Sequence, residues 1–217
     1  MDNRKFWNER YQSLPALGSG PGSRAYAAWL KRRLIESIVA ERNIRSILDI
    51  GCGDMYWMPA DSLAGVAYTG VDISDLIVQQ NRLRFPDAEF LLHDIAAAPL
   101  PRSADLVVCF DVLIHQIDEA QFSAALRNIL ATIEDTALIS YLTPAGHTQV
   151  VAGDTPEAVM QEEQKLLEFL SAASFPRAQT ATHGELAQLI SRLRPDLDVT
   201  VAGSYPAQTI YAVALRA

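Results

Sequence analysis

Short apolar runs alternate with helical stretches along most of the chain, and this alternation limits the possible folds more than any other feature. The runs are SILDI (46–50), AYTGVDI (67–73), AEFLLHDI (88–95), ADLVVCFDV (104–112) and TALISYLT (136–143). Apolar residues at helical spacing occupy 24–42, 74–84 and 118–133, and we expect a short helix after Pro59. The alternation predicts an α/β fold, in which a doubly wound, mostly parallel sheet carries helices on both faces.

The end of the chain departs from this rhythm. LDVTVAGSYPAQTIYAVALRA (197–217) contains two strand-like runs joined by a short Gly/Pro turn. A parallel pair needs a crossover of a dozen or more residues, so this link predicts a last strand that runs antiparallel. The segment from about 144 to 185 is long for a connection and contains the amphipathic stretch EAVMQEEQKLLEFL. We expect it to form a helical insertion over the strand ends, where open sheets bind ligands.

Length and composition fit one domain with a well-filled core, because the chain has 217 residues of which 49% are apolar. The net charge of −8 disfavours a protein that follows nucleic-acid phosphates. The N-terminus has no apolar signal-peptide core, and no apolar run is long enough to span a membrane. Cys52 and Cys109 have neither metal-site nor disulfide-framework spacing. We expect a soluble protein of a reducing, cytoplasmic compartment.

A small basic cluster stands out against this acidic background. It consists of Arg24, Lys31, Arg32 and Arg33 within a helical stretch. Charge runs on a helix are usually solvated, so we expect these side chains to form its exposed face.

The first strand ends in a glycine turn. Asp49, Gly51 and Gly53 lie in SILDIGCGD, and Tyr56 occupies the place of the third glycine in a dinucleotide-binding G-x-G-x-x-G motif. That third glycine allows close helix–strand packing beside a pyrophosphate. A nicotinamide-dependent oxidoreductase is therefore disfavoured, and two glycines alone are weak evidence for any ligand.

Acidic residues recur where later strands end. Asp72 closes the second run, Asp94 the third and Asp111, after Phe110, the fourth. A carboxylate can accept two hydrogen bonds from ribose hydroxyls, and another can accept one from an exocyclic amine. These acids predict a ligand with a sugar, an amine and a cationic part but no phosphate.

Four stretches resemble the successive motifs of class I S-adenosylmethionine-dependent methyltransferases: ILDIGCGD, YTGVDIS, FLLHDI and ADLVVCFDVLIH. They follow in the family's order and spacing, and the resemblance covers about 45–143. It implies a Rossmann-like methyltransferase fold with seven strands, in agreement with the reversed final strand. The departure is GDMYWM, where many members have a further glycine after the acid. S-adenosylmethionine has no pyrophosphate, which explains why two glycines suffice.

The resemblance also implies roles for individual residues. Asp49 lies near the amino group of the methionine part, and Gly51 and Gly53 run beneath that part. The remaining residues implied to contact the cofactor are Asp72 at the ribose, Ile73 beside the adenine, Asp94 at the adenine amine, Ile95 stacking nearby, and Phe110 beside the sulfonium.

The N-terminal FWNERYQSLPALGSGPGS resembles the leader of many such enzymes, which folds over the cofactor. Trp7 and Tyr11 are four residues apart, so they share a helix face and could cover an adenosyl group or a cationic sulfur. We therefore expect one methyltransferase domain over 1–217 with an N-terminal cap at 1–25. Packing of both rings against the core is the alternative.

The histidines differ in their suitability as a general base. His115 follows the fourth strand and is the preferred candidate for a hydroxyl acceptor, although a packing role is equally compatible. His93 should point away from the site, because it precedes Asp94 within a strand. His147 lies in the insertion and is a weaker candidate. His183 is expected at the surface start of a helix, in a capping box formed by Thr182 and Glu185.

These observations predict an S-adenosylmethionine-dependent methyltransferase that yields S-adenosylhomocysteine and uses no metal. The stretch CFDVLIHQ lacks the Asn/Asp-Pro-Pro-Tyr/Phe turn of enzymes that methylate base amines. We therefore expect a small-molecule acceptor, such as a hydroxyl of a saccharide or natural product, with neither a nucleic-acid nor a membrane partner. The alternative is a catalytically silent protein that keeps the cofactor site. The sequence leaves the oligomeric state and the acceptor open.

Overall fold

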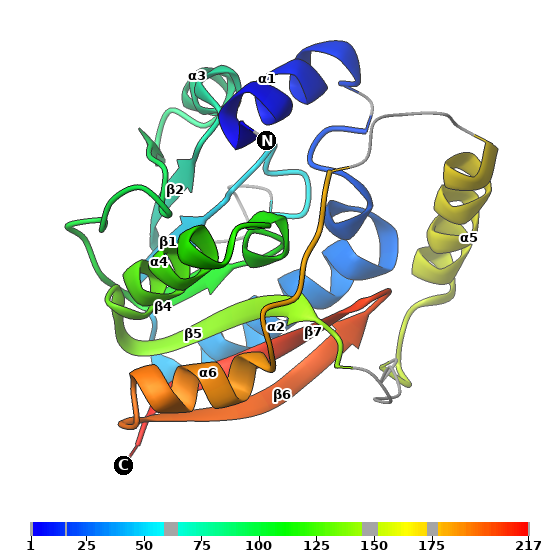
Figure 1. Cartoon of the computed structure of the whole chain (residues 1–217). Coiled ribbons are helices and arrows are strands. Elements are labelled where there is room, and N and C mark those ends of the chain that lie inside the picture. The colour runs from blue at the N-terminus through cyan, green and yellow to red at the C-terminus, as the bar shows by residue number, and fades with distance from the viewer. Residues whose placement is uncertain (1, 16, 59–64, 145–151, 173–177, 217) are drawn as a thin grey trace.

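Seven strands form one sheet in the computed structural model, which describes residues 2–15, 17–58, 65–144, 152–172 and 178–216 (Figure 1). Their order across the sheet is β3-β2-β1-β4-β5-β7-β6. The strands are β1 (Ser46–Ile50), β2 (Ala67–Asp72), β3 (Glu89–Leu92), β4 (Ala104–Cys109), β5 (Ile133–Leu142), β6 (Leu197–Tyr205) and β7 (Gln208–Leu215). The first five strands pair in parallel, whereas β7 is antiparallel to both β5 and β6. The predicted mostly parallel sheet with an antiparallel last strand is confirmed.

The helices lie at both faces of the sheet and at its edge. They are α1 (Asn3–Ser13), α2 (Ala25–Arg42), α3 (Asp75–Arg84), α4 (Glu119–Leu130), α5 (Glu157–Ala172) and α6 (Leu186–Leu193), with 3-10 turns η1 (Pro21–Ser23) and η3 (Leu113–His115). The predicted helices at 24–42, 74–84 and 118–133 are confirmed within a few residues. The helix expected after Pro59 falls outside the described residues.

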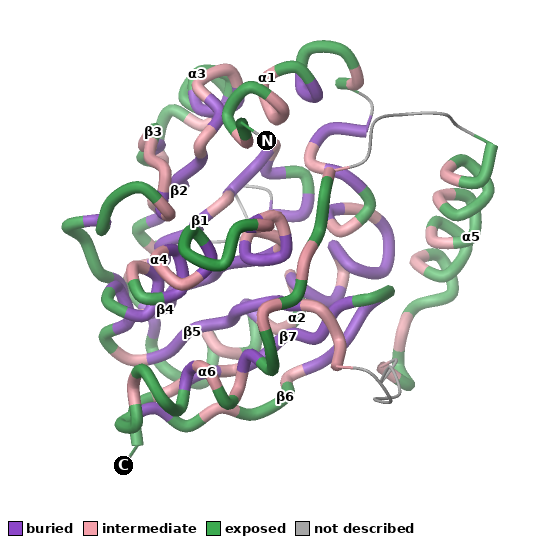
Figure 2. The backbone as a smooth tube through the Cα atoms, viewed as in Figure 1, coloured by how far each residue is buried: buried purple, intermediate pink, exposed green. Residues whose placement is uncertain are grey.

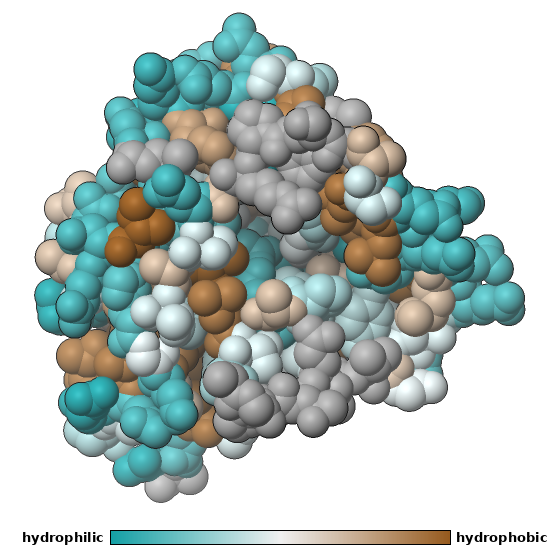
Figure 3. All heavy atoms as spheres, turned by 45° about the vertical axis from the view of Figure 1, so that its right-hand side comes forward, coloured by the Kyte–Doolittle hydropathy of each residue, from teal (hydrophilic) through white to brown (hydrophobic). Residues whose placement is uncertain are grey.

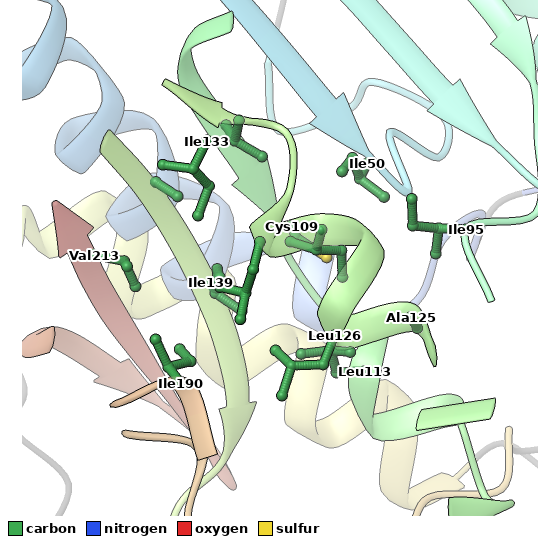
Figure 4. Close-up of a cluster of buried hydrophobic side chains, with 14 of the residues drawn as sticks. Ile50, Ile95, Cys109, Leu113, Ala125, Leu126, Ile133, Ile139, Ile190 and Val213 are labelled. Atoms are coloured by element: carbon green, nitrogen blue, oxygen red, sulfur yellow. The ribbon is translucent and has the colours of Figure 1, made fainter. Parts of the chain in front are cut away.

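Two hydrophobic clusters hold the layers together, one on each face of the sheet. Strand side chains alternate between them, so that Val107 and Cys109 of β4 enter one cluster and Leu106 and Val108 the other. α4 and α6 cover the first cluster, as Figure 4 shows, and α2 and α3 cover the second. Figure 2 shows this burial along the strands, whereas α5 has no buried residue.

Two predicted strands end earlier than expected, at the edge where the parallel strands finish. β3 stops at Leu92, after which the Asp94 carboxylate accepts the backbone N–H of Ala96 and turns the chain. β4 stops at Cys109, because Asp111 has a positive φ of 60° that an extended strand cannot include. The sheet therefore gives way to loops where the acidic residues begin.

The expected capping box before α6 is wrong. The helix begins at Leu186 with Glu185 at its N-cap and no side-chain capping bond. Gly184 turns the chain with a φ of 114°, so Thr182 does not reach the helix. His183 is instead half-buried, stacks on Phe122 and donates from Nε2 to the carbonyl of Gln116 at 2.8 Å.

Leu126 on α4 provides a test of the packing. It is 1% exposed within the first cluster, so Leu126→Ala should lower the free energy of unfolding by about 2–5 kcal/mol through lost contacts and a cavity. Leu83→Ala on α3 is the control, because Leu83 is 85% exposed and its loss should change stability by less than about 0.5 kcal/mol. Urea unfolding of the two variants measures both, and equal midpoints would contradict the assignment of this core.

Candidate active site

A cavity opens at the carboxyl ends of the parallel strands, where the chain order reverses between β1 and β4. We call it the strand-end cavity. Its lining residues are Asn3, Trp7, Tyr11, Ser19, Ser23, Ile50, Gly51, Gly53, Val71, Asp72, Ile73, His93, Asp94, Ile95, Phe110, Asp111, Val112, His115 and Gln116. All of the predicted site residues except Asp49 belong to this set, so strands distant in sequence bring them together.

The glycine turn after β1 forms the floor of this cavity. Gly51 and Gly53 have positive φ angles of 82° and 55°, which favour glycine. A Cβ atom at Gly51 would clash with the Val112 side chain, and one at Gly53 would clash with Ser19. Glycine is therefore required at both positions, where the neighbouring side chains leave no room for a Cβ atom and the turn lines the cavity with backbone.

The position of the missing third glycine lies outside the cavity. Tyr56 is 55% exposed and stacks beneath the guanidinium of Arg24, 4.0 Å from the ring centre. Trp57 is buried and packs edge-on against Phe110. The aromatic residues of GDMYWM therefore pack against the protein, and neither lines the cavity in the described part of the chain.

Asp72 organises the turn as well as the cavity. One of its carboxylate oxygens accepts the N–H of Gly53 at 3.0 Å, and the other accepts the N–H of Ser74 at 2.8 Å. Burial raises the pKa of Asp72 to about 6, and these backbone donors oppose that rise. Each carboxylate oxygen keeps one unused lone pair, so two ribose hydroxyls could still donate hydrogen bonds to Asp72.

Asp49 lies behind the cavity and does not line it. Its carboxylate accepts the hydroxyl hydrogen of Tyr68 at 2.6 Å inside the core. Burial raises the pKa of Asp49 to about 7, against the opposing effects of Tyr68 and Lys31. The expected contact with a methionine amino group therefore stays a prediction that this geometry does not support directly.

α1 covers one side of the cavity with aromatic rings. Trp7 lies 5.9 Å from Tyr11 and 5.3 Å from His115 between ring centres, and the Tyr11 hydroxyl is 3.1 Å from Ser19 Oγ. Asn8 anchors the helix, because it donates to Asp75 at 2.6 Å and accepts from the Ser74 hydroxyl. Figure 1 shows α1 beside α3, as these bonds require.

His115 has a defined tautomer. Its Nδ1 lies 3.0 Å from the carbonyl oxygen of Gln179, which can only accept, so Nδ1 carries the proton. Its Nε2 therefore holds a lone pair. Burial lowers the pKa of His115 below the usual 6.5, so the ring is uncharged at neutral pH.

The prediction for His93 is wrong. β3 ends before it, and the side chain lines the strand-end cavity while Nε2 bonds the carbonyl of Ala98 at 2.9 Å. The strand alternation that should have turned it away does not extend to this residue. His147 lies outside the described residues.

The predicted exposed basic face is also wrong, apart from Arg33. Lys31 is 0% exposed and pairs with Asp111 at 2.5 Å, and Arg24 pairs with Asp54 at 2.6 Å. Arg32 donates to the Trp57 carbonyl. Lys31 is buried and Arg24 and Arg32 are half-buried, because α2 packs against the loops at the strand ends. Helical spacing alone does not reveal this tertiary arrangement.

Asp111 lines the strand-end cavity, and the sequence did not reveal its surroundings. It accepts hydrogen bonds from Lys31, from the Tyr205 hydroxyl at 2.6 Å and from the Gln208 amide. Burial alone would raise the pKa of Asp111, but these donors, Lys31 above all, hold it below its usual value. The carboxylate is therefore charged where it meets the cavity.

A second cavity adjoins the first and is larger, with a volume of about 330 Å³ compared with about 80 Å³ for the strand-end cavity. We call it the side cavity. Its lining residues are Trp7, Arg10, Ser19, Pro21, Gly22, Ala27, Asp111, Ile114, His115, Glu163, Leu166, Leu167, Leu170, Ala178, Tyr205, Pro206 and Gln208. Trp7, Ser19, Asp111 and His115 line both cavities and form the junction between them.

The strand-end cavity suits a nucleoside that carries a positive charge and lacks phosphates. Three aspartates line it, and no Lys or Arg occurs among its described lining residues. Phosphate binding would favour such cations, whereas a sulfonium favours acids and aromatic rings. The glycine turn that lines the cavity and these acids fit S-adenosylmethionine.

Comparison with known proteins agrees with this geometry. Residues 47–135 match a family model described as a methyltransferase domain. A probable S-adenosylmethionine-dependent methyltransferase of Mycolicibacterium smegmatis is 32% identical over 194 residues, which cover 83% of this chain and 74% of that protein. A similarly described protein of Mycobacterium tuberculosis H37Rv is 32% identical over 133 residues, or 59% of this chain. The match spans less than half, 47%, of that relative's length.

Solved structures share the fold. Magnesium protoporphyrin IX methyltransferase from Synechocystis PCC 6803, with bound S-adenosylhomocysteine, superposes with a TM-score of 0.62 at 19% identity and 98% coverage of both chains. An N-methyltransferase from Bradyrhizobium japonicum gives 0.61 at 12% identity, covering 95% of this chain and 98% of that one.

Among the described residues, no helix is long and apolar enough to cross a membrane.

The sheet order, the strand-end cavity and the relatives together identify the family of the chain. The chain belongs to the class I S-adenosylmethionine-dependent methyltransferases, whose cofactor is S-adenosylmethionine.

Proposed function

We propose that this protein transfers a methyl group from S-adenosylmethionine to a hydroxyl of a small natural-product molecule held in the side cavity. The observation that carries the proposal is the junction of the two cavities, where Trp7, Ser19, Asp111 and His115 face both. At this junction a group in one cavity can reach a group in the other. Alignment of two reactants at such a point lowers the barrier of a displacement reaction.

The strand-end residues hold the cofactor in this proposal. Asp72 accepts hydrogen bonds from the ribose, Asp94 accepts one from the adenine amine, and Ile73 and Ile95 flank the ring. The other proposed contacts are Gly51 and Gly53 beneath the methionine part, Phe110 beside the sulfur, and Trp7 and Tyr11 over the bound molecule. When bound, S-adenosylmethionine supplies a methyl group on a positively charged sulfur.

His115 acts as the general base. Its proton is on Nδ1, so Nε2 is free to receive the proton that the acceptor hydroxyl loses. Its lowered pKa keeps that nitrogen unprotonated at neutral pH. The edge contact with Trp7 and the bond to the Gln179 carbonyl hold the ring in place.

Asp72 provides the test of cofactor binding. Asp72→Ala should weaken S-adenosylhomocysteine binding by about ten- to a hundredfold in calorimetry, because hydrogen bonds to a charged group contribute roughly 1.5–3 kcal/mol. Asp198→Ala, on the exposed part of β6, is the matched control and should bind normally. Unaltered affinity in the Asp72 variant would show that this carboxylate does not hold the nucleoside.

His115 provides the test of chemistry, with S-adenosylhomocysteine formation measured on a panel of hydroxyl acceptors. The wild-type kcat/KM should fall as the pH drops through a value below 6.5, because the imidazole then becomes protonated. His115→Asn should lower kcat by about 10²–10⁴-fold and lack this acidic limb. Its affinity for S-adenosylhomocysteine should stay within about threefold of wild type. Unchanged kcat in the variant would exclude the base, and no turnover of any acceptor would favour a silent cofactor-binding protein.

A further inference from the structure

We infer that the methyl acceptor is amphipathic, with a hydroxyl-bearing head at the junction and an apolar body that lies along α5. The inference rests on the proposed function and specifies its substrate class. The side cavity has polar groups on its sheet side, from Asp111, His115, Tyr205 and Gln208. The opposite wall is the helix α5, whose contribution is mainly leucine.

α5 presents one continuous stripe to the cavity. Glu163, Leu166, Leu167 and Leu170 all line it, at relative positions 0, 3, 4 and 7, which lie on one face of a helix. Such a stripe normally packs into a core, yet no residue of α5 is buried and Leu167 is 53% exposed. The stripe therefore lines the cavity and stays only partly covered by protein.

The helix is anchored with this face toward the cavity. Glu163 accepts the N–H of Tyr26 at the start of α2 at 3.2 Å, and the Tyr26 hydroxyl accepts the N–H of Ala152 at 3.0 Å. Arg33 and Asp154 form an ion pair beside it. α2 is therefore the support that orients the leucines.

The charged side chains on the cavity wall already have protein partners. Asp111 pairs with Lys31, and Glu163 accepts from Tyr26. Arg10 donates to the carbonyl of Gly18 and lies over the Trp7 ring. Ionic recognition of the acceptor is thus secondary to apolar contact in this cavity.

The remaining wall extends the apolar character. Ala27, Pro21 and Ile114 also line the cavity. Figure 3 shows hydrophobic surface on both sides of a hollow in this face of the molecule. A saccharide would place hydroxyls against leucines without hydrogen-bond partners, which is costly, whereas an alkyl or other apolar body is stabilised there. Within the proposed natural-product class, the wall therefore favours an apolar-bodied acceptor.

Binding of phenols with increasing alkyl chains tests the inference directly. Phenol, 4-ethylphenol, 4-butylphenol and 4-hexylphenol are titrated by calorimetry into protein saturated with S-adenosylhomocysteine. The Kd should fall about fourfold for each added methylene until the chain fills the cavity. Leu166→Gln/Leu170→Gln should weaken 4-hexylphenol by at least tenfold and phenol by less than threefold.

Leu83→Gln is the matched control, because Leu83 is exposed on α3, and it should bind every probe as wild type does. A Kd independent of chain length, equal weakening of phenol and 4-hexylphenol by the double variant, or no binding of any probe would overturn the inference. S-adenosylhomocysteine affinity is measured on the same samples. If the wild-type protein does not bind S-adenosylhomocysteine, the proposed function itself is overturned. If it binds S-adenosylhomocysteine but binds the phenols with a Kd independent of chain length, only the acceptor class is overturned.

Discussion

The buried ion pair between Lys31 and Asp111 is the interaction on which the arrangement of the site depends. Lys31 has no exposed side-chain surface, and its ammonium also donates to the Gly22 carbonyl at 2.6 Å. A buried charge without a partner is strongly destabilising, so each member constrains the other. Because Tyr205 and Gln208 also donate to Asp111, the ion pair joins the η1 loop, α2, the end of β4 and the β6–β7 hairpin. These four elements surround the junction of the two cavities.

The parallel sheet gives this junction its chemical setting. Parallel strands deliver their carboxyl ends to one edge, and here that edge carries Asp72, Asp94 and Asp111. Asp72 and Asp94 also bond backbone N–H groups of the turns that follow their strands. The same acids thus shape the loops and present negative charge to a ligand. A cationic nucleoside fits this edge. The leucines of α5 form one wall of the adjoining side cavity.

Sequence patterns predicted the features that depend on local periodicity and strand ends. The alternation of strands and helices, the helix positions and the antiparallel β7 follow from spacing. The location of Gly51, Gly53, Asp72 and Asp94 at the strand-end cavity follows from their places after buried strands. Features set by packing between distant segments escaped prediction. The burial of Lys31 needs Asp111, eighty positions away, and the Asp49 carboxylate turns to Tyr68 in the core. His93 was misassigned because its strand ends one residue earlier, where alternation no longer applies.

A double-mutant cycle on Lys31 and Asp111 tests the central claim most directly. Lys31→Met, Asp111→Asn and the double variant are compared with wild type by urea unfolding, and Asn suits the positive φ at this position. The account predicts that Lys31→Met alone loses about 3–5 kcal/mol of unfolding free energy. It also predicts that the double variant retains about 2 kcal/mol more stability than the sum of the single losses allows. Losses that add to within about 0.5 kcal/mol would show that the two side chains do not act as a pair, and would contradict the account.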